Sequence, residues 1–165
     1  KGFDYGIKAL SILIKKHPDV KLVIVGSGAI EEHKKITQDY GVSDKVIFTG
    51  FRDDIHDLVQ AMDIYWLPSR SEGVPNTMME AMAAKKPVVA FDIAGVAELI
   101  KNEENGIVVP FEDVETLSSR TADLIENPQK RKIIGEKGYQ TVVNDYSMQK
   151  MCQMMEKYLL ELVKK

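Results

Sequence analysis

Glu72 and Glu80 stand eight positions apart, and the stretch between them is the best candidate for chemistry in this chain. A helix is predicted to begin between them, near Pro75 or Asn76, because Pro fits the first helical position and Asn is a good cap. The first N–H groups of a helix lack internal partners and lie at the positive end of its dipole. The helix start is therefore suited to bind a phosphate group.

The two carboxylates suit the groups on either side of such a phosphate. Glu80 lies roughly 6 Å along the helix axis from its start, which is too far for a phosphate at the tip but right for the hydroxyls of a sugar beyond it. Glu72 precedes the helix and can bind a group on the other side, while Gly73 lets the backbone approach a ligand closely. Two acids flanking a phosphate site indicate a nucleotide diphosphate sugar.

The elements around this stretch alternate as strand and helix. The apolar run Ile64–Leu67 ends in Pro68, and a second run, Pro87–Phe91, follows the helix. Further strands are expected at 21–25, 46–49 and 107–109, and helices at 1–16, 29–40, 55–62, 95–100, 116–126, 130–144 and 148–165. This pattern predicts an α/β fold with a doubly wound parallel sheet in one domain, residues 1–165, and places the loop at the end of a parallel strand, where such sheets bind ligands.

The stretch from Glu72 to Ala90, EGVPNTMMEAMAAKKPVVA, resembles the Glu-x7-Glu signature of retaining glycosyltransferases with the GT-B fold, especially family 4 (group 1). It departs from the usual pattern at Val74, where Phe is common, and at Lys85-Lys86, where a Gly often stands. The resemblance implies that Glu72 contacts the donor sugar and that Glu80 holds the ribose. It also implies contacts to the sugar and diphosphate from the loop and helix start: Gly73, Val74, Pro75, Asn76 and Thr77.

Other segments match the same family. Lys1-Gly2 resembles the end of an Arg-x4-Lys-Gly element whose cations neutralise the donor diphosphate, so Lys1 is expected to act with Glu72 in catalysis. The loop at Gly26 and Gly28 is similar to one near the nucleotide and phosphates, and Glu31 stands where a dinucleotide fingerprint needs a third Gly. The remaining match, implied to receive the nucleoside, is Gly50, Phe51 and Arg52; Arg52 stacks on a base or is a solvated arginine.

The resemblance implies transfer of a hexosyl group, with retention, from a UDP-sugar or GDP-sugar to an acceptor in polysaccharide, lipopolysaccharide or glycolipid synthesis. In this family the leaving diphosphate takes the proton of the acceptor, so neither a cofactor nor a dedicated base is expected. The chain would be the donor-binding half, with the N-terminal acceptor domain missing, and inactive alone. Two alternatives stay open: a donor-binding subunit of a split transferase, and a nucleotide-sugar 2-epimerase.

Composition narrows the function classes. A net charge of −3 over 165 residues gives no nucleic-acid footprint, and a single Cys is consistent with a reducing, cytoplasmic compartment. We expect no metal, since no Asp-x-Asp pair and no His at ligand spacing occurs. No apolar run is long enough to span a membrane, so peripheral association with the inner face of the plasma membrane would depend on the missing half. The first residue, Lys rather than Met, indicates a piece of a longer protein.

Two smaller expectations complete the interpretation. Ser69, Ser71 and Thr77 have no catalytic His tied to them, so they are expected to cap the helix and contact phosphate rather than act as nucleophiles. The predicted helix 148–165 carries an apolar stripe that is rich in Met. The favoured interpretation packs this stripe against its own domain, and the alternative exposes it for a partner domain.

Overall fold

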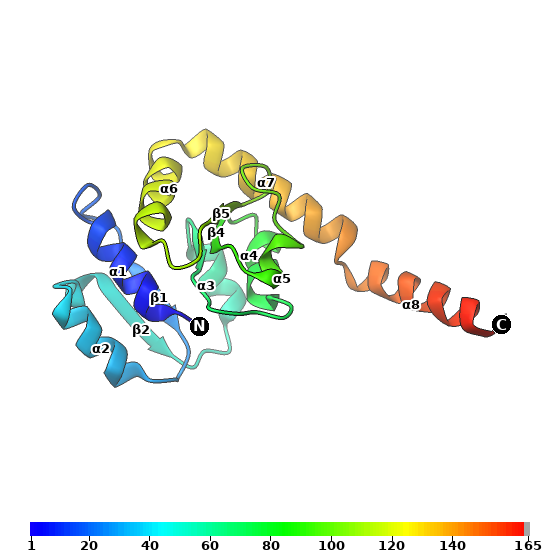
Figure 1. Cartoon of the computed structure of the whole chain (residues 1–165), viewed down its shortest axis with the longest axis horizontal. Helices are drawn as coiled ribbons and strands as arrows, with labels where there is room; N and C mark the ends of the chain where they lie inside the picture. Colours follow the sequence, from blue (N-terminus) through cyan, green and yellow to red (C-terminus); the bar gives the residue numbers. More distant parts are fainter. Residues whose placement is uncertain (164–165) are drawn as a thin grey trace.

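The computed structural model describes residues 1–163, which form helices alternating with short strands (Figure 1). In chain order the elements are α1 (Phe3–Leu13), β1 (Leu22–Val25), α2 (Ile30–Asp39), a 3-10 turn η1 (Ser43–Lys45), β2 (Val46–Gly50), α3 (Ile55–Ala61), β3 (Tyr65–Leu67), α4 (Asn76–Ala83), β4 (Val88–Phe91), α5 (Ala94–Ala97), β5 (Ile107–Val109), α6 (Val114–Glu126), α7 (Pro128–Asp145) and α8 (Met148–Val163).

All paired strands are parallel, as the sequence predicts, but they form two sheets rather than one. One sheet contains β1 and β2, and the other has the order β3-β4-β5. A largely apolar cavity of about 940 Å³ separates β1 from β3 and is lined by both strands together with α1 residues such as Leu10. The fold is an α/β Rossmann-like domain whose sheet is divided between β1 and β3.

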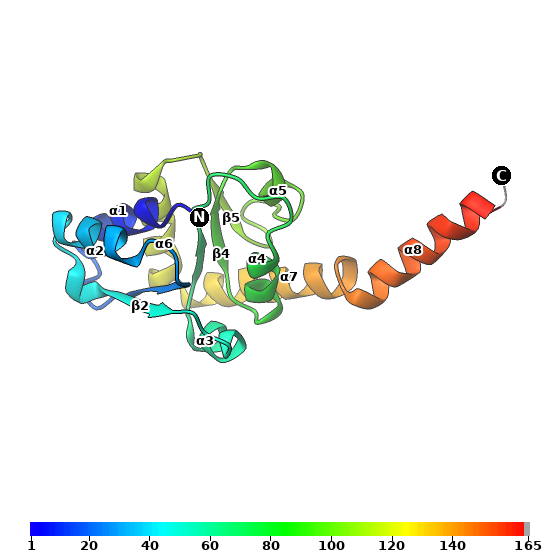
Figure 2. The same cartoon turned by 90° about the horizontal axis from the view of Figure 1, so that it is seen from below.

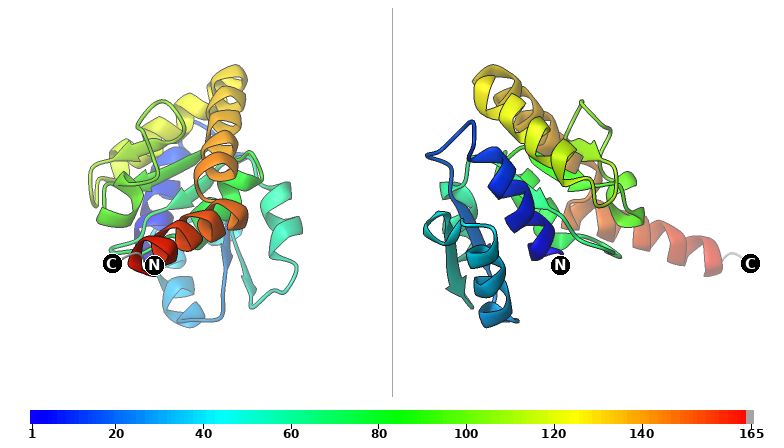
Figure 3. Two further views of the ribbon diagram at one scale, coloured as in Figure 1. Left: turned by 90° about the vertical axis from the view of Figure 1, so that its right-hand side faces the viewer. Right: turned by 60° about the vertical axis from the view of Figure 1, so that its left-hand side comes forward.

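Strand β4 shows why helices cover both faces of the larger sheet. Its four residues are fully buried, and successive side chains point to opposite faces. Val88 and Ala90 pack into a cluster with α3, α4 and α5, whereas Val89 and Phe91 pack against α1 and α6. A strand without a polar face needs cover on both sides, and Figure 3 shows α1 and α6 side by side on one of them.

Helix α1 begins two residues later than expected, and the reason lies in Gly2. Gly2 has φ +69°, a left-handed conformation, and a Cβ added there would lie 1.8 Å from the carbonyl oxygen of Pro68. Only glycine fits such a close backbone approach. This contact holds Lys1 outside the helix and next to the loop that follows β3.

Other helix boundaries also differ from the sequence expectation. Helix α6 begins at Val114 because Asp113 caps it, its Oδ1 accepting a hydrogen bond from the Thr116 N–H at 2.9 Å. Helix α7 begins at Pro128, a residue suited to a first helical turn. Helix α5 is shorter than the predicted 95–100 and starts at Ala94.

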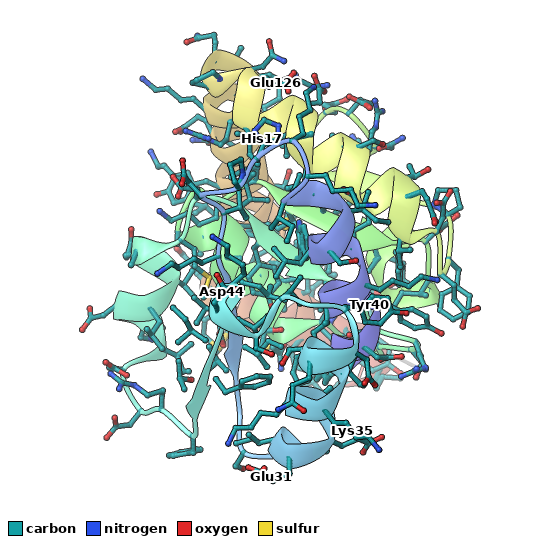
Figure 4. The ribbon with its side chains drawn as sticks, turned by 90° about the vertical axis from the view of Figure 1, so that its left-hand side faces the viewer. His17, Glu31, Lys35, Tyr40, Asp44 and Glu126 are labelled. Carbon is teal, nitrogen blue, oxygen red and sulfur yellow. The ribbon has the colours of Figure 1, made fainter. Side chains whose placement is uncertain are left out.

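An ionic cluster joins the end of α1 to α6. His17 Nε2 lies 3.1 Å from Glu126 Oε1, and the Lys16 ammonium lies 2.5 Å from the same oxygen. Figure 4 shows His17 beside Glu126 at one end of the molecule, with Glu31 and Lys35 on the outer side of α2. The hydrogen bonds and charges of Lys16 and His17 outweigh the opposing effect of burial and lower the pKa of Glu126. The cluster links the segment that follows α1 to the C-terminal end of α6.

The favoured interpretation of the C-terminal helix is wrong. Helix α8 projects from the body of the domain (Figure 2), and none of its residues is buried. Its apolar side chains are exposed: Met148, Met151, Met154, Met155, Tyr158, Leu159, Leu160, Leu162 and Val163. Lys164 and Lys165, the end of the predicted helix, lie outside the described residues. The stripe of α8 therefore contributes nothing to the core of the domain.

Candidate functional site

Lys1, Ser69 and Glu72 meet at the end of β3. The Lys1 ammonium lies 2.8 Å from Glu72 Oε1, and the Ser69 hydroxyl donates a hydrogen bond of 2.7 Å to the same oxygen. The Glu72 side chain is 13 % exposed and that of Lys1 is 55 % exposed. Two residues 71 positions apart in sequence are thus paired, a contact that the family match of Lys1 and of Glu72 did not itself predict.

The electrostatics of this group favour an ionised Glu72. Partial burial raises the pKa of the Glu72 carboxyl, but the hydrogen bonds from Lys1 and Ser69 and the charge of Lys1 outweigh it. The net result is a pKa below the usual value. A carboxylate that stays charged can only accept hydrogen bonds, which is what contact with sugar hydroxyls requires.

The start of α4 has no side-chain cap, so the expectation that Asn76 caps this helix is wrong. Pro75 occupies the cap position, and Asn76 is the first helical residue. The Asn76 N–H donates to Val74 O at 2.9 Å, and the Met78 and Met79 N–H groups donate to Pro75 O. Because Pro75 has no side-chain acceptor, the Thr77 N–H stays uncapped and donates to no backbone carbonyl within residues 1–163. This N–H and the exposed side chain of Asn76 remain available to a ligand.

Glu80 lies on α4 as predicted, exposed to solvent. Within residues 1–163 its carboxylate makes no hydrogen bond or ion pair. Tyr65 lies on the preceding strand near both acids: burial of the phenol raises its pKa, a hydrogen bond with Thr77 lowers it, and the charges of Glu80 and Glu72 raise it further. The two glutamates and the helix start therefore share one region around Tyr65.

The glycine loops of β1 and β2 lie side by side. The Gly26 N–H donates to Gly50 O at 2.9 Å, and no atom lies within 4 Å of where a Cβ would stand on Gly26, Gly28, Gly50 or Gly73. This open space admits a ligand close to the backbone. Phe51, which follows Gly50, is 80 % exposed, so its ring is free to pack on a base.

The guanidinium of Arg52 is paired with the Asp54 carboxylate. Its Nε lies 2.6 Å from Asp54 Oδ1, and its Nη2 contacts Asp54 Oδ2. The hydrogen bonds and the opposite charge raise the pKa of Arg52 and lower that of Asp54, and they outweigh the opposing effect of burial. Because the edge formed by Nε and Nη2 faces Asp54, Arg52 is held in place and offers a ligand the flat face of its guanidinium, as stacking requires.

Sequence reasoning did not single out Arg70. A hollow of about 410 Å³ is lined by Lys1, Gly28, His33 and Arg70, among others, which brings the first glycine loop next to the end of β3. Arg70 Nη2 lies 2.7 Å from Asp4 Oδ2, and its guanidinium lies 4.7 Å from the centre of the Tyr5 ring. An arginine directly after a strand-end serine is a common surface residue, so only the fold shows that it shares this hollow.

Gly95 was also missed. A Cβ added to Gly95 would lie 2.4 Å from Gly73 O and 2.8 Å from Glu72 O, so α5 packs directly against the loop that carries Glu72. The role of Ser69 differs from the expectation as well. It is 1 % exposed and donates to Glu72, so it caps no helix.

Among the residues that the structure describes, no three of His, Cys, Asp and Glu gather in a way that could hold a metal ion. The expectation of a metal-free site stays a prediction. Nor does any helix within residues 1–163 have the length and apolar character needed to cross a bilayer.

Comparison with known proteins decides the family. The family model described as glycosyl transferases group 1 matches residues 1–141. The chain belongs to this group 1 glycosyltransferase family. A relative in this family is the lipopolysaccharide core biosynthesis mannosyltransferase LpcC of Rhizobium leguminosarum bv. viciae. It is 32 % identical over 156 residues, which cover 91 % of this chain and 44 % of the relative. The chain therefore spans less than half the length of this relative.

Solved structures extend the group 1 assignment to the fold. Anabaena HepE (Alr3699) in complex with UDP has a TM-score of 0.92 and 26 % identity, over 98 % of this chain and 45 % of that one. The C-terminal domain of a group 1 glycosyl transferase (LpcC) from Francisella tularensis has a TM-score of 0.81 and 29 % identity, over 90 % of this chain and 80 % of that one. The group 1 domain thus has the Rossmann-like fold of the C-terminal domain of a GT-B glycosyltransferase, as its sequence implied.

Proposed function

We propose that this group 1 domain binds a nucleotide diphosphate sugar and supplies the donor half of a retaining hexosyltransferase. The observation that carries the proposal is the group of Lys1, Ser69 and Glu72, which holds a cation and a carboxylate together beside the start of α4. A cation suits the diphosphate and a carboxylate suits the sugar. HepE, which has the same fold, was crystallised in complex with UDP, and this supports a nucleotide ligand.

Each residue has a part in this proposal. Glu72 accepts hydrogen bonds from the donor sugar, and Glu80, exposed further along α4, accepts them from the ribose. The Thr77 N–H, which donates to no backbone carbonyl within residues 1–163, and the Lys1 ammonium bind the diphosphate. Phe51 and the Arg52 face pack against the base. Gly26, Gly28 and Gly73 leave room for the backbone to approach the ligand.

In the proposed reaction, the bond between the anomeric carbon of the sugar and the diphosphate oxygen breaks. A new bond forms from that carbon to the acceptor oxygen, on the same face of the sugar. The acceptor proton passes to the leaving diphosphate, whose developing charge is stabilised by Lys1 and the Thr77 N–H. This route needs no side chain of the domain as a base.

The acceptor and the base of the donor nucleotide are properties of the whole protein. The chain covers less than half the length of the Rhizobium relative. Relatives such as the Rhizobium mannosyltransferase act in lipopolysaccharide core synthesis, which supports an envelope polysaccharide or glycolipid as acceptor. UDP-sugars and GDP-sugars are the donor classes to test. Without an acceptor-binding half, the isolated domain is expected to transfer little or no sugar.

The test uses the full-length protein with a panel of UDP-sugars and GDP-sugars and a membrane extract as acceptor source, following release of the nucleoside diphosphate. Lys1→Ala is expected to lower the rate about 100-fold, the usual loss when one transition-state contact is removed. Lys8→Ala, an exposed lysine on α1, is the matched control and should retain the native rate. Equal rates for both variants, or no release with any donor, would contradict the proposal.

A further inference from the structure

Ser69 is a buried hydroxyl in the middle of the site. It lies just after β3 and is 1 % exposed. Its Oγ is 2.7 Å from Glu72 Oε1 and 3.5 Å from the carbonyl oxygen of Lys1. A hydroxyl has a single proton to donate. The carboxylate oxygen of Glu72 is closer than the Lys1 carbonyl oxygen and carries a charge, so it accepts that proton in the hydrogen bond. Ser69 therefore donates to Glu72.

This geometry excludes direct chemistry by Ser69. A side chain with almost no exposed surface cannot touch a substrate, and its proton is engaged by the carboxylate. Among residues 1–163, no histidine side chain makes a hydrogen bond with Ser69 or Glu72, so the histidine that usually activates a nucleophilic serine is not in place. Whatever Ser69 does for the site, it does through Glu72.

The two oxygens of Glu72 are used unequally. Lys1 and Ser69 both bind Oε1, whereas Oε2 accepts no hydrogen bond from residues 1–163. One oxygen is thus fixed and the other is left to accept a hydrogen bond from outside. In the proposed function that outside group is a hydroxyl of the donor sugar.

Lys1 and Ser69 differ in how firmly they hold Oε1. The Lys1 side chain is 55 % exposed, so a donor diphosphate can draw its ammonium away from Glu72. The Ser69 hydroxyl is enclosed by protein and cannot leave. When phosphate binds Lys1, Ser69 is the remaining hydrogen-bond donor to Oε1.

We propose that Ser69 is a positioning residue: it anchors Oε1 of Glu72 so that Oε2 faces the donor sugar, including when Lys1 binds the diphosphate. The role of this anchor in catalysis rests on the proposed function. The hydrogen bond from Ser69 to Glu72 and its effect on the Glu72 pKa do not. Removal of a hydrogen bond to the charged form of an acid raises its pKa. The pKa of Glu72 therefore shows whether the Ser69 hydrogen bond is present, without a measurement of catalysis.

The first experiment follows the Glu72 pKa by carbon NMR of the 165-residue chain labelled at Glu. Ser69→Ala is expected to raise this pKa, and Ser69→Thr, which keeps the hydroxyl, to restore it. Ser118→Ala is the matched control, since Ser118 is also buried, at 3 % exposed, but lies on α6. An unchanged Glu72 pKa in Ser69→Ala would overturn the proposal.

The second experiment measures turnover of the nucleotide sugar by the full-length protein, with binding of the nucleoside diphosphate as a structural check. Ser69→Ala should lower kcat about tenfold, the loss typical of one hydrogen bond to a charged group. Its affinity for the nucleoside diphosphate should stay within about twofold, because that ligand has no sugar for Glu72 to hold. An equal loss of kcat and of affinity for the nucleoside diphosphate would indicate a folding defect and overturn the positioning role.

A double variant tests whether Ser69 acts through Glu72. In a Glu72→Ala background, Ser69→Ala should cause no further loss of kcat, because residues coupled in one network are not additive. A further tenfold loss would contradict the proposal. If native protein binds and turns over no nucleotide sugar while the Glu72 pKa still rises in Ser69→Ala, the anchor stands and the proposed function fails.

Discussion

Glu72 is held between opposing effects at the scale of single residues. Burial favours its neutral form, and Lys1 and Ser69 favour the charged form more strongly, so its pKa lies below the usual value. The folded chain thus releases this proton more readily than the unfolded chain does. The stability gained this way is present above the ordinary carboxyl pKa of about 4.3 and is lost as pH falls through the folded value.

Replacing Glu72 by Gln should therefore change the pH dependence of stability. At pH 7 we expect Glu72→Gln to lower the free energy of unfolding by about 1 kcal/mol, as for one hydrogen bond. The difference in the free energy of unfolding between the native chain and the variant should become smaller as pH falls to about 3, below the ordinary carboxyl pKa. Urea denaturation at a series of pH values measures this. Glu115→Gln, an exposed acid on α6, is the control, and a gap that does not narrow would refute the ionised Glu72.

Gly95 offers a steric test of the loop. A Cβ there would lie 2.4 Å from Gly73 O, which is backbone and cannot rotate away. Gly95→Ala should lower the free energy of unfolding by about 1–3 kcal/mol and displace the loop that carries Glu72. Gly6→Ala is the control: its Cβ would meet nothing closer than 3.8 Å, and α1 should tolerate it. Thermal unfolding compares the two, and equal midpoints would contradict this packing.

Residue types predicted the charged groups of the site better than its hydroxyls and glycines. The Glu-x7-Glu pattern located Glu72 and Glu80, and the Lys-Gly match located Lys1. Ser69 was misassigned because sequence does not show which way a hydroxyl points, and this one turns inward to Glu72. Gly95 was missed because its partner, the backbone at Gly73, is distant in sequence.

Element boundaries follow local chemistry where it is strong. Helix α4 and strand β4 lie almost where the apolar runs predict them. Lys85, which joins them, has φ +59°, a left-handed conformation, and this explains why a Gly is common at this point in the resembled signature. The start of α1 escaped prediction because it depends on the contact between Gly2 and Pro68.

Helix α8 provides a test at the scale of elements. Since none of its residues is buried, deletion of residues 148–165 should leave the thermal midpoint of unfolding unchanged within about 2 °C. Ile134→Ala on α7, where the side chain is 2 % exposed, should instead cost about 2–4 kcal/mol. A large drop in the midpoint on deletion would mean that α8 packs on its own domain, as its amphipathic pattern had suggested.

Sequence could not decide the position of α8. An apolar stripe at helical spacing indicates that something covers it, but not whether the cover lies in the same domain. The exposed Met and Leu side chains of α8 form a surface that is unusual for a free monomer.

At the scale of the whole molecule, the predicted α/β class with parallel strands is confirmed. That β1 and β3 do not pair, so that the strands form two sheets, was not predictable, because apolar strands carry no sequence code for their neighbours. The loops that follow β1 and β3 nonetheless share one hollow, lined by Lys1, Gly28 and Arg70, and the Gly26–Gly50 bond joins the loop after β2 to the loop after β1. Catalysis also needs an acceptor, so the domain is expected to bind donor and leave transfer to the whole protein.

The most direct test of the donor-site claim is calorimetric titration of the 165-residue chain with UDP, GDP and ADP and their sugar conjugates. We expect one nucleotide series to bind. Glu80→Ala should weaken that binding about tenfold, as for loss of a charged hydrogen bond. Glu161→Ala, an exposed acid on α8, should bind as the native chain does. Absence of binding to any of these nucleotides at millimolar concentration, or equal affinity of the native and Glu80→Ala chains, would contradict the donor site.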